Sequence, residues 1–215
     1  MKLVCISDTH GDHEQMSLPS GDVLIHAGDL TAHGKKNETE QFMQWFGNQP
    51  FAHKLCVAGN HDTFMESDPE LASEYAKDNG VVLLNDSGYQ VANVNFWGSP
   101  ITPRFLDWSF MRDPGEPIEA HWRLIPENTD VLITHGPPHG ILDQIRRPAG
   151  HLECTGCPSL YERIQLVLPA KHIFGHIHEA YGEFHEKNVG YHNVSSMNEH
   201  YRISNDAIVI DVSSG

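Results

Sequence analysis

Five short apolar segments of this chain each end at residues that commonly bind metal ions. They are Leu3–Ile6 before Asp8 and His10, Val23–Ile25 before Asp29, Leu55–Val57 before Asn60, His61 and Asp62, Val131–Ile133 before His135, and Ile173–Phe174 before His176 and His178. Short apolar runs bounded by turn residues are typical of buried strands. Open α/β sheets bind their ligands just beyond the carboxyl ends of strands. The fivefold repetition therefore predicts that these polar side chains form one site.

The candidate ligands are two carboxylates, one amide oxygen and four imidazoles, from Asp8, His10, Asp29, Asn60, His135, His176 and His178. Asp8 and His10 are two residues apart, so an extended chain would point both side chains the same way, and His176 and His178 repeat this spacing. A mixed oxygen and nitrogen set without thiolates suits Mn²⁺, iron or Zn²⁺ rather than a structural zinc site. Seven ligands are too many for one open catalytic ion. We therefore expect two divalent transition-metal ions, with Mn²⁺ favoured, that share a bridging carboxylate.

The charge balance favours a small anionic substrate. The chain has 29 acidic residues against 14 basic ones, and its formal net charge is -15. Such a surface repels polyanions, so we expect no long nucleic acid as a partner. Two divalent ions would make the site locally positive, and ions about 3.5–4 Å apart stabilise both the attacking and the leaving oxygen at phosphorus. We expect a small phosphoester, attacked by a metal-bridging hydroxide.

Length and composition predict one globular domain over residues 1–215, large enough to bury a core without crosslinks. No apolar stretch is long enough to span a bilayer, and the N-terminal run is interrupted by Asp8, so we expect a strand there and no membrane association. Two of the four cysteines, Cys5 and Cys56, lie in predicted core strands, which argues against a disulfide framework. We expect a cytoplasmic location.

The order of predicted elements indicates a layered α/β fold. Strands are expected at 2–7, 22–27, 53–58, 81–84, 89–97, 130–134, 171–174, 183–186, 190–195 and 206–212. Helices are expected at 38–46 with Asn37 as N-cap, from Pro69 behind the cap Asp68, around 118–124, and through Leu160 and Leu168. Strands and helices alternate in the first half and strands dominate the end. We expect two mixed sheets packed together with helices outside.

Five motifs lie at the predicted strand ends: Asp8-Thr9-His10, Gly28-Asp29, Gly59-Asn60-His61-Asp62, Thr134-His135-Gly136 and Gly175-His176-Ile177-His178. In this order they resemble the motifs of the calcineurin-like metallophosphoesterases. Two further stretches, from Trp97 to Phe105 and from Phe174 to Gly182, resemble the small MPPED-type metallophosphoesterase-domain proteins of that family. The resemblance implies a metallophosphoesterase sandwich of two mixed β-sheets flanked by helices, in agreement with the predicted order of elements.

The resemblance also implies a role for each motif residue. One metal ion would be held by Asp8, His10 and His178, the other by Asn60, His135 and His176, with Asp29 as the bridge. His61 would lie beside the substrate, as general acid for the leaving oxygen or as a stabiliser of the transition state. Asp62 would orient His61, as carboxylates beside histidines commonly do.

Departures from related groups narrow the substrate. Protein serine/threonine phosphatases resemble this site but carry arginines after the Gly-Asp and Asn-His-Glu motifs, where this chain has Leu30-Thr31-Ala32-His33 and Asp62-Thr63-Phe64-Met65. Purple acid phosphatases place a tyrosine three residues after the bridging Asp, where this chain has Ala32. A phosphoprotein substrate and tyrosinate-bound ferric iron are therefore not expected.

The long loop over residues 98–129 and its surroundings hold further candidates. Arg104 is a candidate contact for substrate phosphate, with an ordinary surface ion pair as the equal alternative, and His33 is a second candidate. Trp97, Phe105 and Trp108 are expected to fill the interior of the loop, with a stacking wall for a ring as the alternative. The Cys-x-x-Cys spacing of residues 154–157 stands alone and predicts no redox or zinc site.

These patterns favour hydrolysis of small phosphodiesters, cyclic nucleotides among them, by a dinuclear metal site. A phosphomonoesterase acting on nucleotides or sugar phosphates is the alternative within the same class. A non-catalytic binding scaffold is the alternative from another class, and the complete set of seven ligands with His61 argues against it. Nuclease action on long chains is disfavoured by the charge and by the lack of a basic stripe.

Overall fold

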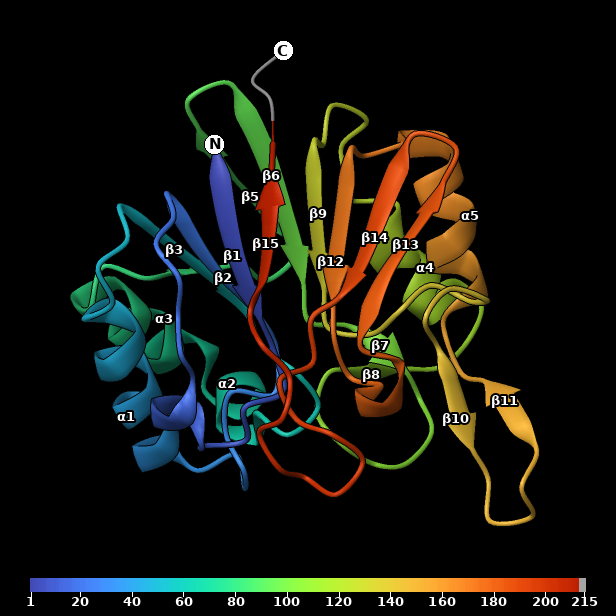
Figure 1. Ribbon diagram of the computed structural model, residues 1–215, viewed down its shortest axis with the longest axis horizontal. Helices are drawn as coiled ribbons and strands as arrows, with labels where there is room; N and C mark the ends of the chain where they lie inside the picture. Colours follow the sequence, from blue (N-terminus) through green and yellow to red (C-terminus); the bar gives the residue numbers. More distant parts are fainter. Residues whose placement is uncertain (213–215) are drawn as a thin grey trace.

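The computed structural model describes residues 1–212, in which two mixed sheets stack face to face (Figure 1). The first sheet has the order β15-β1-β2-β3-β4, with bounds β1 Lys2–Ile6, β2 Val23–Ala27, β3 His53–Val57, β4 Val82–Leu83 and β15 Ile208–Asp211. Strands β1 to β4 are parallel, and β15 pairs antiparallel with β1. The carboxyl ends of β1, β2 and β3 therefore meet at one edge.

The second sheet has the order β13-β14-β12-β9-β6-β5. Its bounds are β5 Ser87–Val91, β6 Val94–Ser99, β9 Val131–Thr134, β12 Lys171–Phe174, β13 Gly182–Glu186 and β14 Val189–Asn193. The inner strands β6, β9, β12 and β14 are parallel, whereas β5 and β13 pair antiparallel at the two edges. Two short pairs lie outside these sheets: β7 Thr102–Pro103 with β8 Met111–Arg112, and β10 Gln144–Arg146 with β11 Leu152–Cys154.

Helices cover the outer faces of both sheets, as Figure 1 shows. The α-helices are α1 Lys36–Gly47, α2 Thr63–Ser67, α3 Pro69–Asp78, α4 Glu116–Trp122 and α5 Pro158–Val167, and the 3-10 helices are η1 His13–Gln15 and η2 His178–Ala180. Helices α1 and α3 lie on the side of the first sheet and α4 and α5 on the side of the second. The predicted sandwich of two mixed sheets flanked by helices is confirmed.

The alternation of side chains along β1 shows how the core is divided. Leu3 and Cys5 belong to the apolar cluster between the sheets, which also contains Ile133 of β9. Val4 points the other way, into the cluster that contains Phe42 of α1. Because successive strand residues point to opposite faces, the apolar run Leu3–Ile6 of this one strand fills both layers of the core.

Local capping and turn chemistry agree with the sequence in some places and not in others. Asp68 caps α3 as predicted, with Oδ1 accepting from the Leu71 amide at 3.2 Å. The predicted N-cap Asn37 is wrong, because α1 begins earlier and Lys35 occupies that position. The strand predicted at 89–97 is instead a hairpin of β5 and β6, turning at Ala92, which has φ 52°. Leu168 lies just beyond α5, as its left-handed C-cap.

Two remaining expectations concern membranes and thiols. Within residues 1–212, no helix is both long and apolar enough to cross a bilayer. Cys5 and Cys56 are buried free thiols in β1 and β3. Burial raises the pKa of both thiols, which keeps them protonated and favours a packing role.

Candidate metal centre

The seven predicted ligands come together where strands of both sheets end, and this edge is the lower one in Figure 1. We call them the floor of the site: Asp8, His10, Asp29, Asn60, His135, His176 and His178. Three overlapping groups have ligand atoms within 4.8 Å of one another: Asp8, His10 and His178; His10, Asp29 and His61; and Asp29, His135 and His176. The first sheet supplies the carboxylates and the second sheet supplies three of the imidazoles.

Asp29 lies between the two ends of the floor. Its Oδ2 is 3.7 Å from His10 Nε2 and 3.4 Å from His135 Nε2. On one side, His10 Nε2 is 3.4 Å from His178 Nε2. On the other, His135 Nε2 is 2.9 Å from Asn60 Oδ1. The floor therefore divides into two groups of ligand atoms around one shared carboxylate.

Four of the seven floor residues adopt unusual backbone conformations. Asp8, His10, Asp29 and His176 have φ values of 51°, 42°, 55° and 71°, in the left-handed region that residues other than glycine rarely occupy. The sequence predicted an extended chain from Asp8 to His10, and this prediction is wrong. The chain turns sharply as soon as β1 ends. Strained conformations of this kind persist where the surrounding structure fixes them, and they cluster at functional sites.

Glycines in the motifs allow the floor to pack closely. A Cβ atom on Gly59 would overlap the Asp29 carboxylate, and one on Gly175 would overlap the carboxylate of Asp8. Glycine is therefore required before Asn60 and before His176, because a carboxylate oxygen lies so close to the backbone there that any side chain would displace it. This gives a physical reason for the Gly-Asn and Gly-His pairs of the motifs.

The hydrogen bonds of the rings test whether the floor fits metal ions. His135 Nδ1 lies 3.0 Å from the Ala27 carbonyl oxygen, and His178 Nδ1 lies 3.1 Å from that of Asn198. A carbonyl oxygen only accepts, so each Nδ1 carries the hydrogen, and in the neutral ring Nε2 is left as an acceptor. These two Nε2 atoms face the floor's carboxylate oxygens at 3.4 and 3.5 Å. Acceptors that converge in this way suit divalent cations.

The electrostatics of the floor agree with this fit. Burial opposes ionisation of Asp29 and Asp8, but the neighbouring His135 and His178 outweigh it and hold the pKa of each carboxyl below its usual range. Burial also opposes a charge on His135, yet the Asp29 carboxylate raises the pKa of its imidazole to about 9, so a cation bound at Nε2 would replace a proton there. The floor therefore stabilises positive charge at its centre, as a cation site must.

His61 lies at the side of the cavity, and one of its ring nitrogens has no hydrogen bond to any of residues 1–212. Its backbone amide donates to Asp29 Oδ1 at 2.8 Å, which fixes it next to the floor. Its Nδ1 is 3.1 Å from the Ala32 carbonyl oxygen, so Nδ1 carries a hydrogen and Nε2 is free to face the cavity. The ring packs edge-on against His10, with centroids 4.5 Å apart.

Asp62 does not touch the His61 ring. Its Oδ1 accepts from the Thr31 amide at 2.9 Å and hydroxyl at 2.7 Å, and its Oδ2 accepts from the amides of Gly59 at 2.7 Å and Leu30 at 3.2 Å. The prediction that Asp62 orients His61 is therefore wrong, because a carbonyl oxygen holds the ring, and three backbone amides and the Thr31 hydroxyl occupy the carboxylate. Asp62 instead joins the turn after β2 to the turn after β3.

A cavity of about 690 Å³ opens above the floor. We call the loop and hairpin side chains that border it the rim: Arg104, Phe105, Leu106, Trp108, Arg147, Glu153 and Tyr201. The expectation that Phe105 and Trp108 fill the loop interior is wrong, since both are exposed at this cavity. Trp97, by contrast, is partly buried against the core as expected.

The two substrate contacts predicted from sequence are engaged elsewhere. Arg104 borders the cavity, but its guanidinium donates to Asp113 at 2.8 Å and to Asp107 at 3.3 Å, so the surface ion pair is the contact observed. His33 pairs with Glu38 at the start of α1, at 3.3 Å, and among the described residues it is not part of the cavity lining.

Sequence reasoning missed the segment after β14. Ser195 Oγ donates to Asp8 Oδ2 at 2.8 Å, and the ring of Tyr201 packs on His10 and His178 with centroids 5.1 and 5.0 Å away. A signal was present, because polar residues follow the buried strand that ends at Asn193, in the pattern seen at the other five strand ends.

Comparison with known proteins agrees with this arrangement. Residues 1–180 match the family model described as calcineurin-like phosphoesterase. The chain belongs to this family. It is 35% identical to Metallophosphoesterase domain-containing protein 1 of Homo sapiens, over 98% of this chain and 71% of that protein. It is 36% identical to a UPF0046 protein of Caenorhabditis elegans, over 97% of this chain and 74% of that protein.

Solved structures share the fold of this phosphoesterase at low sequence identity. The protein TT1561 of Thermus thermophilus superimposes with a TM-score of 0.62 at 13% identity, over 89% of this chain and 88% of that chain. Another crystal structure superimposes with a TM-score of 0.67 at 14% identity, over 89% of each chain. Family membership and the three groups of potential ligands together support a metal-dependent phosphoesterase.

Proposed function

We propose that this phosphoesterase hydrolyses small phosphodiesters with two divalent transition-metal ions, Mn²⁺ favoured, on its floor. One ion would be held by Asp8, His10 and His178, the other by Asn60, His135 and His176, and both by Asp29. The interatomic distances support this division, since Asp29 Oδ2 faces His10 on one side and His135 on the other. The ions, when bound, supply positive charge for the phosphoryl group and activate water.

In this proposal His61 gives a proton to the leaving oxygen. Its Nδ1–H is taken by the Ala32 carbonyl, so Nε2 is the nitrogen that can carry a second proton toward the cavity. As an imidazolium, His61 donates this proton as the ester bond breaks, and the ring returns to its neutral form. If the leaving oxygen needs no proton, the same N–H stabilises its charge by a hydrogen bond.

One observation carries the preference for diesters: an exposed aromatic surface lies beside His61. Phe105 and Trp108 are 54% and 42% exposed, and the Trp108 ring centroid is 4.3 Å from that of His61. A diester has a second organic arm, and aromatic faces bind such arms without adding charge. Of the two rim arginines, Arg104 is engaged by two carboxylates, so it does not offer the free donors that sites for monoester dianions usually add.

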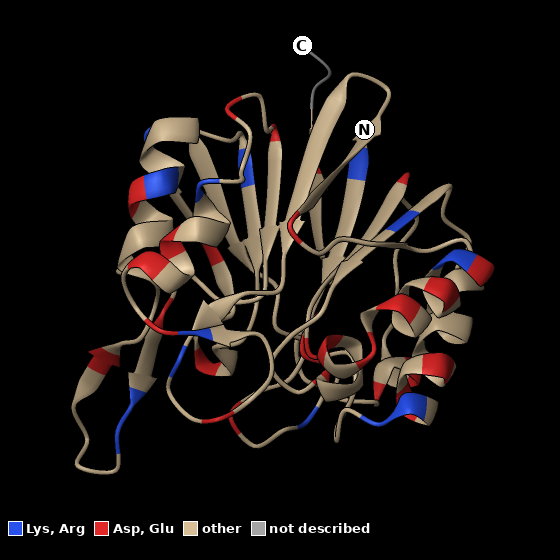
Figure 2. Cartoon of the chain, turned by 180° about the vertical axis from the view of Figure 1, so that it is seen from behind, with Lys and Arg blue, Asp and Glu red and all other residues tan. Residues whose placement is uncertain are grey.

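The surface charge supports a small substrate. Figure 2 shows acidic residues along the helices on both sides of the sandwich, with few basic ones between them. With a net charge of -15, such a surface opposes the approach of long nucleic acids. Small diesters, cyclic nucleotides included, carry one negative charge at the scissile group and are repelled far less.

The direct test compares bis(p-nitrophenyl) phosphate with p-nitrophenyl phosphate under the same Mn²⁺ conditions. We expect a higher kcat/KM for the diester, and only a modest loss of diester cleavage in Arg104→Ala. A clear preference for the monoester, or a collapse of all activity in Arg104→Ala, would overturn the proposal in favour of a phosphomonoesterase.

A further inference from the structure

Two arginines of the rim differ in how their guanidinium groups are used. All three nitrogens of Arg104 donate, Nε to Asp113, Nη1 to Asp107 and Nη2 to the Met111 carbonyl. Arg147 uses only Nε, which donates to Glu153 at 2.5 Å. In the described part of the chain, Nη1 and Nη2 of Arg147 have no hydrogen bond. Arg147 therefore brings an available pair of donors to the cavity.

The hairpin that carries Arg147 is fixed at its base. Strands β10 and β11 pair antiparallel, beginning with Gln144 opposite Cys154. The Arg147 amide extends this pairing by donating to the His151 carbonyl oxygen. The buried carboxylate of Asp143 accepts from the amides of Gly140 at 2.9 Å and Gly156 at 3.0 Å, which joins the two ends of the hairpin. These contacts fix the base of the hairpin on which Arg147 stands.

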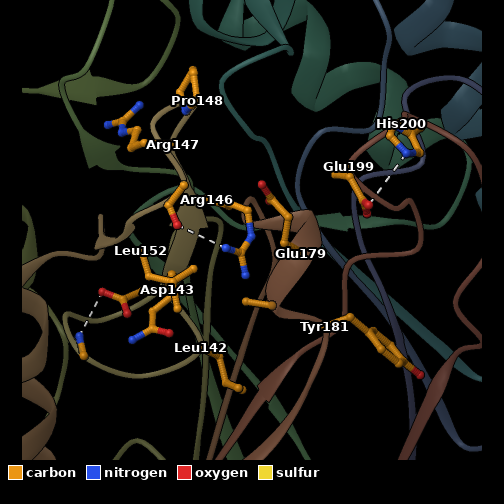
Figure 3. Close-up of a pocket in the computed structure, with 14 residues that line it drawn as sticks. Leu142, Asp143, Arg146, Arg147, Pro148, Leu152, Glu179, Tyr181, Glu199 and His200 are labelled. Carbon is orange, nitrogen blue, oxygen red and sulfur yellow. Dashed lines mark hydrogen bonds and ion pairs between the residues drawn. The ribbon is translucent and has the colours of Figure 1, made fainter.

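The neighbouring Arg146 has different surroundings. It borders an adjacent cavity of about 1030 Å³, together with Glu179, and its Nη1 donates to the Gly150 carbonyl. Both hairpin arginines line that cavity, and in Figure 3 Arg146 points in among its other lining residues. Of the two hairpin arginines, only Arg147 also borders the cavity above the floor.

We propose that Arg147 binds a second anionic group, a phosphate or a carboxylate, on the diester arm remote from the cleaved bond. This inference rests on the proposed phosphodiesterase function. The two Nη atoms of a guanidinium match the spacing of two oxygens of such a group. The ion pair with Glu153 is about half exposed, so it stabilises little by itself, and it uses Nε while leaving both Nη atoms available.

The experiment uses two chromogenic diesters that differ only in the second anion: the p-nitrophenyl ester of thymidine 5′-phosphate, with and without a 3′-phosphate. The variant is Arg147→Gln, and the controls are Arg146→Gln and Arg104→Gln. Because loss of Arg147 also breaks its ion pair, Glu153→Gln removes the pair while keeping the guanidinium. Calorimetric titration with uncleavable phosphonate analogues of both esters gives a readout independent of turnover.

We expect wild type to prefer the 3′-phosphorylated ester by about 10-fold or more in kcat/KM, the usual effect of charge-assisted hydrogen bonds. In Arg147→Gln the ratio of the two kcat/KM values should fall to about 1, because KM for the 3′-phosphorylated ester rises. The dissociation constants of the two analogues should become equal in the same way. Arg146→Gln, Arg104→Gln and Glu153→Gln should keep the ratio.

Several results would overturn the inference. The first is a wild type that does not prefer the 3′-phosphorylated ester, and the second is an Arg147→Gln variant that keeps this preference. The third is an equal loss of the preference in Glu153→Gln, which would show that only the structure of the hairpin matters. A loss of p-nitrophenyl phosphate cleavage in Arg147→Gln would assign this residue to the scissile phosphate of a monoester. If neither diester is cleaved, the proposed function fails, and the calorimetric ratio still decides the role of Arg147.

Discussion

The floor and the rim of the metal centre are built in different ways. Floor residues follow strands of the core and are held by buried or partly buried contacts, such as those of Asp8 with Ser195 and of Asp29 with the His61 amide. Rim residues stand on a loop, a hairpin and the segment after β14, and Phe105 and Tyr201 are 54% and 55% exposed. Since burial fixes the floor but not the rim, we expect the floor to decide whether hydrolysis occurs and the rim to decide which ester is cleaved.

The largest effect is expected from the residue shared by both halves of the floor. Asp29→Ala should lose metal and reduce hydrolysis to background, because its carboxylate faces ligand nitrogens on both sides. Removal of metal from the wild type by a chelator should also reduce hydrolysis to background. Added Mn²⁺ should restore hydrolysis by the wild type but not by Asp29→Ala. Elemental analysis and diester hydrolysis measure this, with Asp12→Ala at an exposed position as the control. Two retained ions in Asp29→Ala would contradict the shared role.

The next effect separates catalysis from metal binding. His61→Ala should keep metal content near that of wild type while lowering kcat by roughly 10²–10⁴-fold, the usual range for a general acid. The loss should shrink for esters with very acidic leaving groups, which need no proton. An equal loss on all esters would indicate charge stabilisation instead, and a loss of metal would assign His61 to the floor.

A third prediction concerns the support beneath the floor. Asp62→Ala leaves four donors, from Gly59, Leu30 and Thr31, without their buried acceptor. This should cost about 3 kcal/mol or more of unfolding free energy, and lower Tm by roughly 6–12 °C. Asp68→Ala, which removes only the cap of α3, should cost about 1 kcal/mol. If Asp62→Ala unfolds like wild type but loses activity as His61→Ala does, Asp62 acts through the ring after all.

The smallest effect is expected at the rim. Trp108→Ala should raise KM for an aryl diester by about 3- to 10-fold and leave kcat nearly unchanged, because the ring binds the ester arm and does no chemistry. A methyl ester, with less surface to stack, should be affected less. Leu166, an exposed residue of α5 outside the cavity lining, provides the control as Leu166→Ala. A fall in kcat with unchanged KM would instead mean that Trp108 positions His61.

Much of the floor was predictable because its signal is local. A run such as Val23–Ile25 forms a buried strand by composition alone, and the polar residue that follows must lie at the end of that strand. Parallel pairing then brings such ends together without further information. The same reasoning reached the two mixed sheets and the cap at Asp68, while the hairpin at Ala92 was missed because its turn lacks glycine or proline.

The tertiary structure decided which partners the remaining side chains take. Asp62 accepts from residues about 30 positions away, and Arg104 and Arg147 differ only in the acceptors that happen to lie near each guanidinium. Long polar side chains gain little free energy from burial, so no periodicity in the sequence records their contacts. The sequence by itself thus determined the fold, the family and the candidate ligands of the floor, whereas the contacts of the rim arose only when distant loops met around the cavity.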